Sequence, residues 1–437
     1  MTVEAKSDPP GVGARRAALK LLDAVLRRGL PLESALQSAT SGIDRADDRG
    51  LAHAIAAAVL RWLPDLDALI DSATKKPLPP DAKARFALRI ALAQALLLET
   101  PGHAAIATVL PLVDGGPRKL VHGVFGTLTR QGATLPELPS LPEPVAERWR
   151  EAWGLEMVEA ARHALAQQAP IDLTLADPKT GEALGGMNLV PGHVRLPAAT
   201  RVTELPGYAE GGWWVQDIAA SLPARLLGKG EGRTALDLCA APGGKTMQLA
   251  AAGWRVTAVD ASKQRLGRLR ENLKRTGLQA ETVVADALFY DPQTGFDAVL
   301  VDAPCSATGI FRRHPDVLHR VRPKAIAGLA EQQQAILARA AQAVKPGGTL
   351  VYAVCSLEPE EGEHVAEAFL AAHAGFSALP PADLASAFGA EAAGLIRNPA
   401  APHMLRVLPG AFASAGGADG FFVATFHRKD EQGLAPG

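Results

Sequence analysis

The fold is decided by residues 234–260, which read TALDLCAAPGGKTMQLAAAGWRVTAVD. A short apolar run leads into a Pro-Gly-Gly turn, a helical pattern follows, and a second apolar run closes on Asp260. Similar runs rich in β-branched residues recur at AETVVADA (280–287), FDAVLVDAP (296–304) and GGTLVYAVCS (347–356), and helical patterns lie between most of the runs. Alternating strands and helices predict an α/β domain with a mostly parallel sheet and helices on both faces.

The rest of the chain divides into parts with different patterns. Residues 1–13 are typical of a flexible head, whereas 14–133 show the apolar spacing of amphipathic helices and predict an all-α domain. A proline-rich linker follows over 134–145, and 146–215 predicts a small helical and α+β insert. The α/β domain then covers 216–430, and its last runs, MLRVLPG and GFFVATFHRK, are expected to add antiparallel strands at the sheet edge.

Composition narrows the class of protein. The 437 residues are 48% hydrophobic and 21% charged with a formal net charge of -1, so any affinity for a nucleic acid must come from local basic patches. The three cysteines form no C-x-x-C pair, which argues against a zinc site or a disulfide framework. The N-terminus lacks the apolar core of a signal peptide, and no apolar run is long enough to span a bilayer. We expect a cytoplasmic monomer with no metal and no membrane partner.

The predicted strands of the sheet end in residues that can bind a ligand or do chemistry. Ligands of open α/β sheets sit beyond the carboxyl ends of the strands, so these residues are expected to meet at one edge. They are Cys239, Ala240, Ala241, Pro242, Gly243, Gly244 and Lys245 after the first strand, Asp260 and Asp286 after the next two, Asp302 and Cys305 after the fourth, and Cys355 after the fifth.

The first turn and the two aspartates indicate the kind of cofactor. The Pro-Gly-Gly turn lets a ligand approach the backbone, but it is not the G-x-G-x-x-G of dinucleotide sites. Asp260 is placed to hydrogen-bond ribose hydroxyls, and Asp286 to hold an adenine edge. A nucleoside without a pyrophosphate suits this set. We predict S-adenosylmethionine as the cofactor, since its sulfonium charge also favours a nearby carboxylate.

Three motifs resemble the signatures of RNA cytosine-5 methyltransferases of the Sun (Fmu, RsmB-like) type. They are LDLCAAPGGKT (236–246), VDAPCSATGIFRRHPDV (301–317) and YAVCSLEPEEGEHV (352–365). Flanking stretches, GWWVQDIAASLPARLL and DGFFVATFHRK, resemble the family's segments on either side of the catalytic motifs, and the helical N-terminal third resembles a NusB-like RNA-binding domain. The resemblance implies a Rossmann-like methyltransferase domain preceded by an all-α NusB-like domain and a small insert.

The resemblance also implies a covalent mechanism. Cys355 attacks C6 of a cytosine, Asp302 holds the ring at N3 and the exocyclic amine, and Cys305 promotes loss of the C5 proton and expulsion of Cys355. DNA cytosine-5 enzymes use a Pro-Cys cysteine after the fourth strand as the nucleophile. Residue chemistry alone therefore leaves Cys305 as the alternative nucleophile. Lys245 is expected to shape the cofactor loop or to pair with a site carboxylate, and Cys239 to form pocket wall.

Two basic clusters are candidates for RNA contact. The loop after the Pro-Cys-Ser motif must meet the substrate strand, and we expect phosphate contacts there from Arg312, Arg313, His314 and Arg320. The predicted helix at 263–277 carries a second cluster, for which a solvated face and an RNA contact are equally open: Lys263, Arg265, Arg268, Arg270, Lys274 and Arg275. The target base must be unstacked or single-stranded to reach the pocket.

The predicted product is 5-methylcytidine in 16S ribosomal RNA, because the NusB-like appendage accompanies the small-subunit branch of the family; transfer RNA and 23S ribosomal RNA are the alternatives. The chain departs from the family pattern at three places. Val354 stands where threonine is usual, Gly362 where asparagine is usual, and LTLAD (173–177) where Leu-Arg-Val-Asn is usual. The last departure leaves the role of the insert in RNA binding open.

Other classes of protein fit less well. A nicotinamide-dependent oxidoreductase is disfavoured by the missing G-x-G-x-x-G motif and by the presence of two cysteines, Cys305 and Cys355, after neighbouring predicted strands. An amino-group methyltransferase is disfavoured because no Asp-Pro-Pro-Tyr type of motif follows the fourth strand. A non-catalytic RNA-binding or assembly factor is disfavoured by the intact set of Asp302, Cys305 and Cys355.

Overall fold

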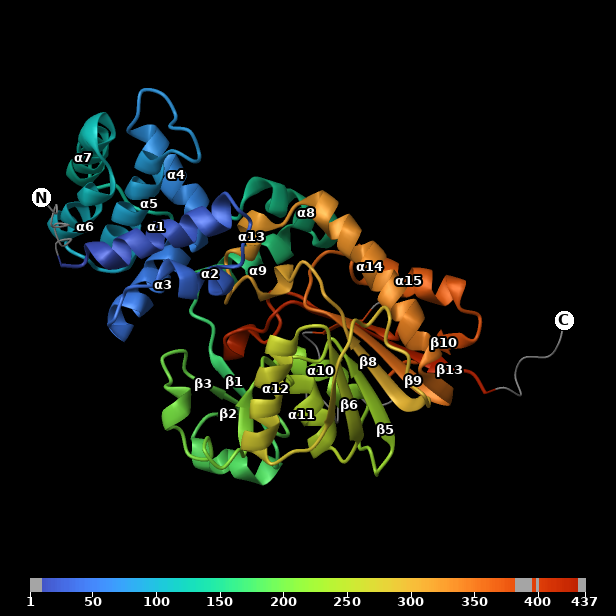
Figure 1. The fold of residues 1–437 in the computed structure, drawn as a ribbon. Coiled ribbons are helices and arrows are strands. Elements are labelled where there is room, and N and C mark those ends of the chain that lie inside the picture. The colour runs from blue at the N-terminus through green and yellow to red at the C-terminus, as the bar shows by residue number, and fades with distance from the viewer. Residues whose placement is uncertain (1–9, 382–394, 398–400, 431–437) are drawn as a thin grey trace, which may run out of the picture. The chain divides into compact units, whose positions relative to one another are not determined.

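The computed structural model describes residues 10–381, 395–397 and 401–430, and the chain forms two compact units. One unit combines residues 1–148 with Phe311–Val321, and the other contains the remainder. Figure 1 shows a helical part and a part built on a central sheet. The predicted all-α domain and the predicted mostly parallel sheet are both confirmed. In the described part of the chain, no helix is both long and apolar enough to cross a membrane.

The helical unit is built around α5 (Lys83–Leu97). The sequence KARFALRIALAQALL is apolar or alanine-rich on every side, and α5 is accordingly buried along most of its length by the surrounding helices. The neighbouring elements are α1 (Val12–Leu26), α2 (Leu32–Ala39), α3 (Ala46–Arg61), α4 (Leu63–Ser72), α6 (Gly102–Val109), η1 (Leu110–Leu112), α7 (Gly115–Arg130) and α13 (Val317–Arg320).

The segment Phe311–Val321 belongs to the helical unit although it lies far along the chain. Asp316 Oδ2 accepts a hydrogen bond from the backbone N–H of Leu32 at 3.3 Å, and His319 Nε2 lies 2.6 Å from the carbonyl oxygen of Leu60. The sequence pattern predicts one unbroken domain over 216–430 and contains no signal for this exchange. The local apolar pattern of the segment cannot tell which core will bury it.

The second unit begins with helices and a small antiparallel sheet. Its strands lie in the order β2-β3-β1-β4, and the adjacent turns are 3-10 helices. This is the α+β insert expected between the helical part and the large sheet. Its elements are α8 (Glu143–Trp153), which begins in the helical unit, α9 (Leu155–Ala166), β1 (Ile171–Leu175), η2 (Pro178–Leu184), β2 (Met187–Val190), β3 (His193–Leu196), η3 (Val202–Glu204) and β4 (Trp213–Val215).

The large sheet has the order β11-β12-β13-β9-β8-β5-β6-β7, with β10 paired to β13. The five strands from β9 to β7 are parallel, whereas β12 and β13 run antiparallel, as the two last apolar runs predict. The strands are β5 (Thr234–Leu238), β6 (Arg255–Asp260), β7 (Glu281–Val284), β8 (Phe296–Asp302), β9 (Val344–Val354), β10 (Phe376–Ala378), β11 (Leu395–Arg397), β12 (Met404–Val407) and β13 (Phe421–Arg428).

Helices cover both faces of this sheet (Figure 1). The central strands are therefore buried on both sides, which explains their continuous runs of valine, leucine and alanine. The remaining elements are α10 (Ile218–Leu226), α11 (Gly244–Ala251), α12 (Lys263–Thr276), η4 (Thr308–Ile310), α14 (Pro323–Gln342), α15 (Glu363–Ala372) and η6 (Ala413–Ala415).

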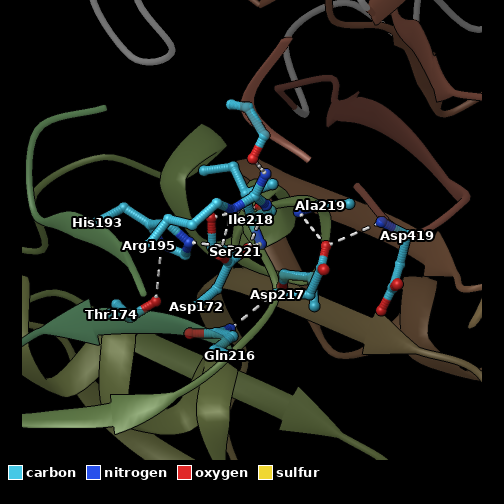
Figure 2. Close-up of polar contacts among 12 residues, drawn as sticks. Asp172, Thr174, His193, Arg195, Gln216, Asp217, Ile218, Ala219, Ser221 and Asp419 are labelled. Atoms are coloured by element: carbon cyan, nitrogen blue, oxygen red, sulfur yellow. Dashed lines mark hydrogen bonds and ion pairs between the residues drawn. The ribbon is translucent and has the colours of Figure 1, made fainter. Parts of the chain in front are cut away.

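A buried ion pair of the small sheet contacts α10 and η6 (Figure 2). Asp172 on β1 accepts two hydrogen bonds from Arg195 on β3, at 2.6 and 2.7 Å, and a third from the backbone N–H of Ile218 at 3.0 Å. Arg195 also donates to the carbonyl oxygen of Ala415 at 2.8 Å. Burial opposes ionisation of Asp172, but the hydrogen bonds from Arg195, with His193 Nε2 3.5 Å away, outweigh it and lower the pKa of Asp172.

Removing one partner of this pair should destabilise the protein. Arg195→Met leaves a buried carboxylate without its main counter-charge, which costs about 3–5 kcal/mol of unfolding free energy. Arg201→Met is the matched control, because its pair with Glu204 is exposed and should contribute less than about 1 kcal/mol. Urea unfolding at neutral pH measures both. Equal stability of the two variants would contradict a structural role for the buried pair.

Candidate active site

The turn after β5 is held in an unusual conformation by residues from neighbouring strands. Cys239 has a φ of 61° and Gly243 a φ of 107°, and Gly243 is the residue from which α11 begins. A Cβ at Gly243 would lie 2.8 Å from Leu269 Cγ, so this position requires glycine for both its dihedral angle and its space. The Pro-Gly-Gly motif therefore shapes a backbone that another sequence would not adopt.

A cavity of about 380 Å³ lies beside this turn. This volume is within the range of small-molecule sites. Its lining comes from the turn, the start of α11, β4 and α12: Trp214, Gln216, Asp237, Ala240, Ala241, Pro242, Gly244, Lys245, Asn272 and Asp302 are among the residues. Five of the seven predicted turn residues thus line one cavity with Asp302, whereas Cys239 and Gly243 do not line it.

The charged side chains that line the cavity are two acids and two bases: Asp237, Asp302, Lys245 and Arg275. Lys245 Nζ forms an ion pair with Asp302 Oδ2 at 2.7 Å; the lysine is largely buried and the aspartate is half-buried. Asp237 is fully buried; burial raises its pKa to about 7, against a hydrogen bond from the Thr246 hydroxyl. Among the described residues, Asp237 Oδ1 has no hydrogen-bond partner. An unpartnered buried carboxylate oxygen at a cavity wall suits a cationic ligand.

This donor set fits S-adenosylmethionine, which carries a sulfonium and an amino group and needs no phosphate cradle. Asp260, predicted to contact the ribose, holds the turn: its carboxylate accepts from the backbone N–H groups of Ala241 at 3.1 Å and Ser262 at 2.9 Å. Asp286 is exposed two residues beyond the end of β7 and accepts from the N–H of Leu288 at 2.9 Å. Contacts of Asp260 and Asp286 with the cofactor stay predictions.

Two cysteines meet where β8 and β9 end. The Sγ atoms of Cys305 and Cys355 are 3.5 Å apart, and both side chains are partly exposed. A hydrogen bond and repulsion from Cys355, together with burial, raise the pKa of Cys305 well above its usual value. Burial and the charge of Asp302 raise the pKa of Cys239 to about 12, so this third thiol is held in its unreactive form.

A buried polar network behind the thiols was not predicted from the sequence. Its centre is Glu361, which is fully buried and accepts hydrogen bonds from Ser306, Ser356 and Gln333. One signal was available: each of the paired cysteines is followed by a serine, as Cys305-Ser306 and Cys355-Ser356. Nothing in the local pattern of PEEGE identifies which glutamate is buried.

The residues predicted to contact RNA differ in their accessibility. Arg312 is only 2% exposed and lies in the helical unit, so its side chain does not face solvent in this structure. Arg313, His314 and Arg320 are half-buried, and Arg320 is paired with Asp316 at 3.0 Å. On α12, Lys263, Arg268 and Lys274 are exposed, whereas Arg275 donates to the carbonyl oxygens of Tyr208 and Trp213.

No group of three histidine, cysteine or acidic residues that could hold a metal ion occurs in the portion of the chain that the structure describes.

Family comparisons agree with the two parts of the chain. Residues 224–427 match the family described as 16S rRNA methyltransferase RsmB/F, and residues 13–125 match the NusB family. The chain is 34% identical over 421 residues to a ribosomal RNA small subunit methyltransferase B of Xanthomonas campestris pv. campestris, covering 90% of this chain and 95% of the relative. It is 36% identical over 439 residues to the protein of the same name from Xylella fastidiosa, covering 95% and 97%.

Solved structures share the fold at lower identity. The crystal structure of PH0851 covers 97% of this chain and is itself covered completely, with a TM-score of 0.73 and 22% identity. NSun6 from Pyrococcus horikoshii covers 67% of this chain, and 99% of its own length is matched, with a TM-score of 0.56 and 19% identity.

The Pro-Gly-Gly turn can be tested by adding a single methyl group. Gly243→Ala forces a side chain into the left-handed region and against Leu269, which should cost about 1–3 kcal/mol of stability and weaken S-adenosylmethionine binding. Gly267→Ala on α12 is the matched control, because its Cβ meets no atom within 4 Å, and it should be neutral or slightly stabilising. Thermal unfolding with and without the cofactor distinguishes them; identical curves for both variants would contradict the role of Gly243.

Proposed function

The chain belongs to the RsmB/F family of rRNA methyltransferases, which take the methyl group from S-adenosylmethionine, and we propose that it converts a cytidine of 16S rRNA to 5-methylcytidine. The observation that carries the proposal is the pair of thiols 3.5 Å apart at the ends of β8 and β9. Asp302, three residues before Cys305, lines the cavity proposed for the methyl donor. The strand that precedes one of the two thiols therefore ends at that cavity.

The proposed reaction uses Cys355 as a nucleophile because cytosine C5 does not attack a methyl group unaided. The Cys355 thiolate forms a bond to C6, and the electrons of the C5–C6 double bond make C5 nucleophilic. S-adenosylmethionine supplies the electrophilic methyl group on its sulfonium. After C5 has taken the methyl group, loss of the C5 proton re-forms the double bond and expels the Cys355 thiolate. The enzyme is thereby returned to its starting state.

Cys305 is proposed to accept the C5 proton. Its pKa is raised first of all by Cys355, so Cys305 keeps its own proton while Cys355 is a thiolate. Once Cys355 is bonded to carbon it is neutral and the repulsion is removed, so Cys305 can release its own proton to solvent and its thiolate can then take the proton from C5. Residue chemistry alone leaves Cys305 open as the nucleophile, and the proposal of Cys355 follows the motifs shared with the family.

Asp302 is proposed to hold the base through its exocyclic amine and N3. The ion pair with Lys245 orients the carboxylate, while the Asp302 side chain keeps 32% of its surface exposed. A base in the cavity can therefore reach a carboxylate oxygen without breaking the ion pair. Lys245 is itself fixed by its position 5.3 Å above the ring of Phe421.

The 16S target rests on the family description and on the names of the relatives. The NusB match supports RNA binding by the helical unit. Exposed Lys263, Arg268 and Lys274 of α12 are proposed to contact phosphates, with half-buried Arg313, His314 and Arg320 in the loop. The low exposure of Arg312 removes it from this group unless the loop rearranges.

The assignment of the two thiols is tested by methylation of 16S rRNA with labelled cofactor. We expect 5-methylcytidine from the wild type, none from Cys355→Ala, and a trapped covalent protein–RNA adduct in Cys305→Ala. Transfer RNA and 23S rRNA in parallel test the target, and cofactor affinity checks that the variants are folded. Activity that survives Cys355→Ala but not Cys305→Ala would exchange the roles. Absence of methylation on every RNA would favour a non-catalytic factor.

The buried carboxylate of Asp237 predicts a pH-dependent affinity for the cationic cofactor. Burial raises the pKa of Asp237 to about 7, so the group is mostly neutral at lower pH and mostly ionised at higher pH. Affinity for S-adenosylmethionine should rise about tenfold from about pH 6 to about pH 8. Calorimetry should show this rise in the wild type and in the exposed control Asp291→Asn, but not in Asp237→Asn. A flat profile in the wild type would contradict the contact.

A further inference from the structure

We propose that Glu361 is the positioning residue for the two thiols: one buried carboxylate binds the serine that follows each cysteine and so fixes Cys305 and Cys355 relative to each other. The inference rests on the proposed function, because it concerns how that reaction's thiols are held. Glu361 touches neither thiol through a hydrogen bond in the structure and acts through Ser306 and Ser356.

The two cysteine loops converge on the same oxygen atom. Glu361 Oε2 accepts a hydrogen bond from Ser356 Oγ at 2.5 Å and another from Ser306 Oγ, and the two serine hydroxyls are 3.1 Å apart. Glu361 Oε1 accepts from the backbone N–H of Ser306 at 2.8 Å. The Glu361 carboxylate therefore binds the Cys305 loop through the backbone N–H of Ser306. It binds both cysteine loops through the serine hydroxyl that follows each cysteine.

The carboxylate is itself held by the sheet and by α14. Gln333 Nε2 donates to Glu361 Oε1 at 3.0 Å and to the carbonyl oxygen of Pro304 at 2.9 Å. The hydroxyl of Tyr352, on β9, donates to the backbone carbonyl oxygen of Glu361 at 2.5 Å and lies 3.1 Å from Gln333 Oε1. Glu361, Gln333 and Tyr352 are all fully buried. A rigid frame of this kind keeps the carboxylate, and hence both loops, in one arrangement.

The donors to the carboxylate are a backbone amide, two hydroxyls and a side-chain amide, all of them neutral. No cation among the described residues pairs with the Glu361 carboxylate; Arg406, also buried, donates to the carbonyl oxygen of Ser356 and pairs with Glu363. After the contributions of Cys355 and of burial, the charge of Glu361 also raises the pKa of Cys305. Glu361 therefore has two effects on the pair: it sets their separation, and it disfavours a second negative charge while Cys355 is a thiolate.

A purely structural glutamate would affect stability but would leave the ionisation of the thiols unchanged. Glutamine has nearly the same shape as glutamate. Glu361→Gln therefore removes the charge and replaces one carboxylate oxygen, a hydrogen-bond acceptor, by an amide NH2 group, a donor that faces the donors already around it. We expect the pH midpoint for alkylation of Cys305 by iodoacetamide, followed by mass spectrometry, to move to lower pH. We expect kcat for rRNA methylation to fall about 10–100-fold, with KM for RNA and the cofactor Kd within about twofold of the wild type.

Glu358→Gln is the matched control. Glu358 is a second buried carboxylate in the same segment, 1% exposed, but its Oε1 accepts from Trp149 Nε1 at 3.1 Å rather than from the serines. This variant should leave the alkylation midpoint of Cys305 and kcat unchanged. If Glu361→Gln does not fold, Ser306→Ala and Ser356→Ala each remove one connection and keep the charge, and each should lower kcat without moving the alkylation midpoint.

Three results would overturn the inference. The first is an alkylation midpoint of Cys305 in folded Glu361→Gln that equals the wild-type value. The second is a wild-type kcat in Glu361→Gln or in both serine variants. The third is a change in the midpoint and in kcat in Glu358→Gln as large as in Glu361→Gln. The alkylation experiment uses the full-length protein without RNA, so it reports on the thiol pair even if no RNA is methylated. Failure of the proposed function and failure of this inference are therefore separate outcomes.

Discussion

The register of β8 against β9 is the constraint on which the site depends. The two strands are parallel, and Asp302 lies opposite Ala353, so the chain leaves both strands at the same edge of the sheet. Cys305 follows three residues after Asp302 and Cys355 two residues after Ala353, which allows their sulfur atoms to approach to 3.5 Å. A shift by one residue would turn one cysteine loop away from the other, because successive strand residues face opposite sides.

The charged residues at this edge of the sheet and those in the rest of the molecule suit different ligands. Near the turn after β5, Lys245 pairs with Asp302 and Arg265 with Asp260, whereas one carboxylate oxygen of Asp237 has no partner among the described residues. This carboxylate suits a cationic cofactor rather than an RNA phosphate. The contacts with RNA that we propose lie elsewhere, on the exposed lysines and arginine of α12 and in the NusB-like part of the chain. The net charge of the whole protein is close to zero and so does not reveal these local differences in charge.

The chain continues from the loop that carries Cys305 directly into the helical unit. After the Pro-Cys-Ser motif and η4, the chain enters the helical unit at Phe311, is held there through Asp316 and His319, and leaves it after Val321. The helical unit is thus built from two separate stretches of sequence, one of which continues directly from the loop that carries Cys305. Burial of Asp316 and Val317 in that unit restrains the end of the loop.

Local patterns in the sequence determined the order of strands and helices, the turn that requires Gly243, the choice of cofactor and the family, because each depends on residues that are close together in the chain. Tertiary structure alone decided which distant groups meet. The pairing of Asp172 with Arg195, the burial of Arg312 and Phe311–Val321 in the helical unit, and the convergence of Ser306 and Ser356 on Glu361 all join segments whose separate patterns are ordinary. Such contacts depend on how cores pack and on which polar groups must be satisfied once water is excluded, and neither is written in the spacing of residues along one segment.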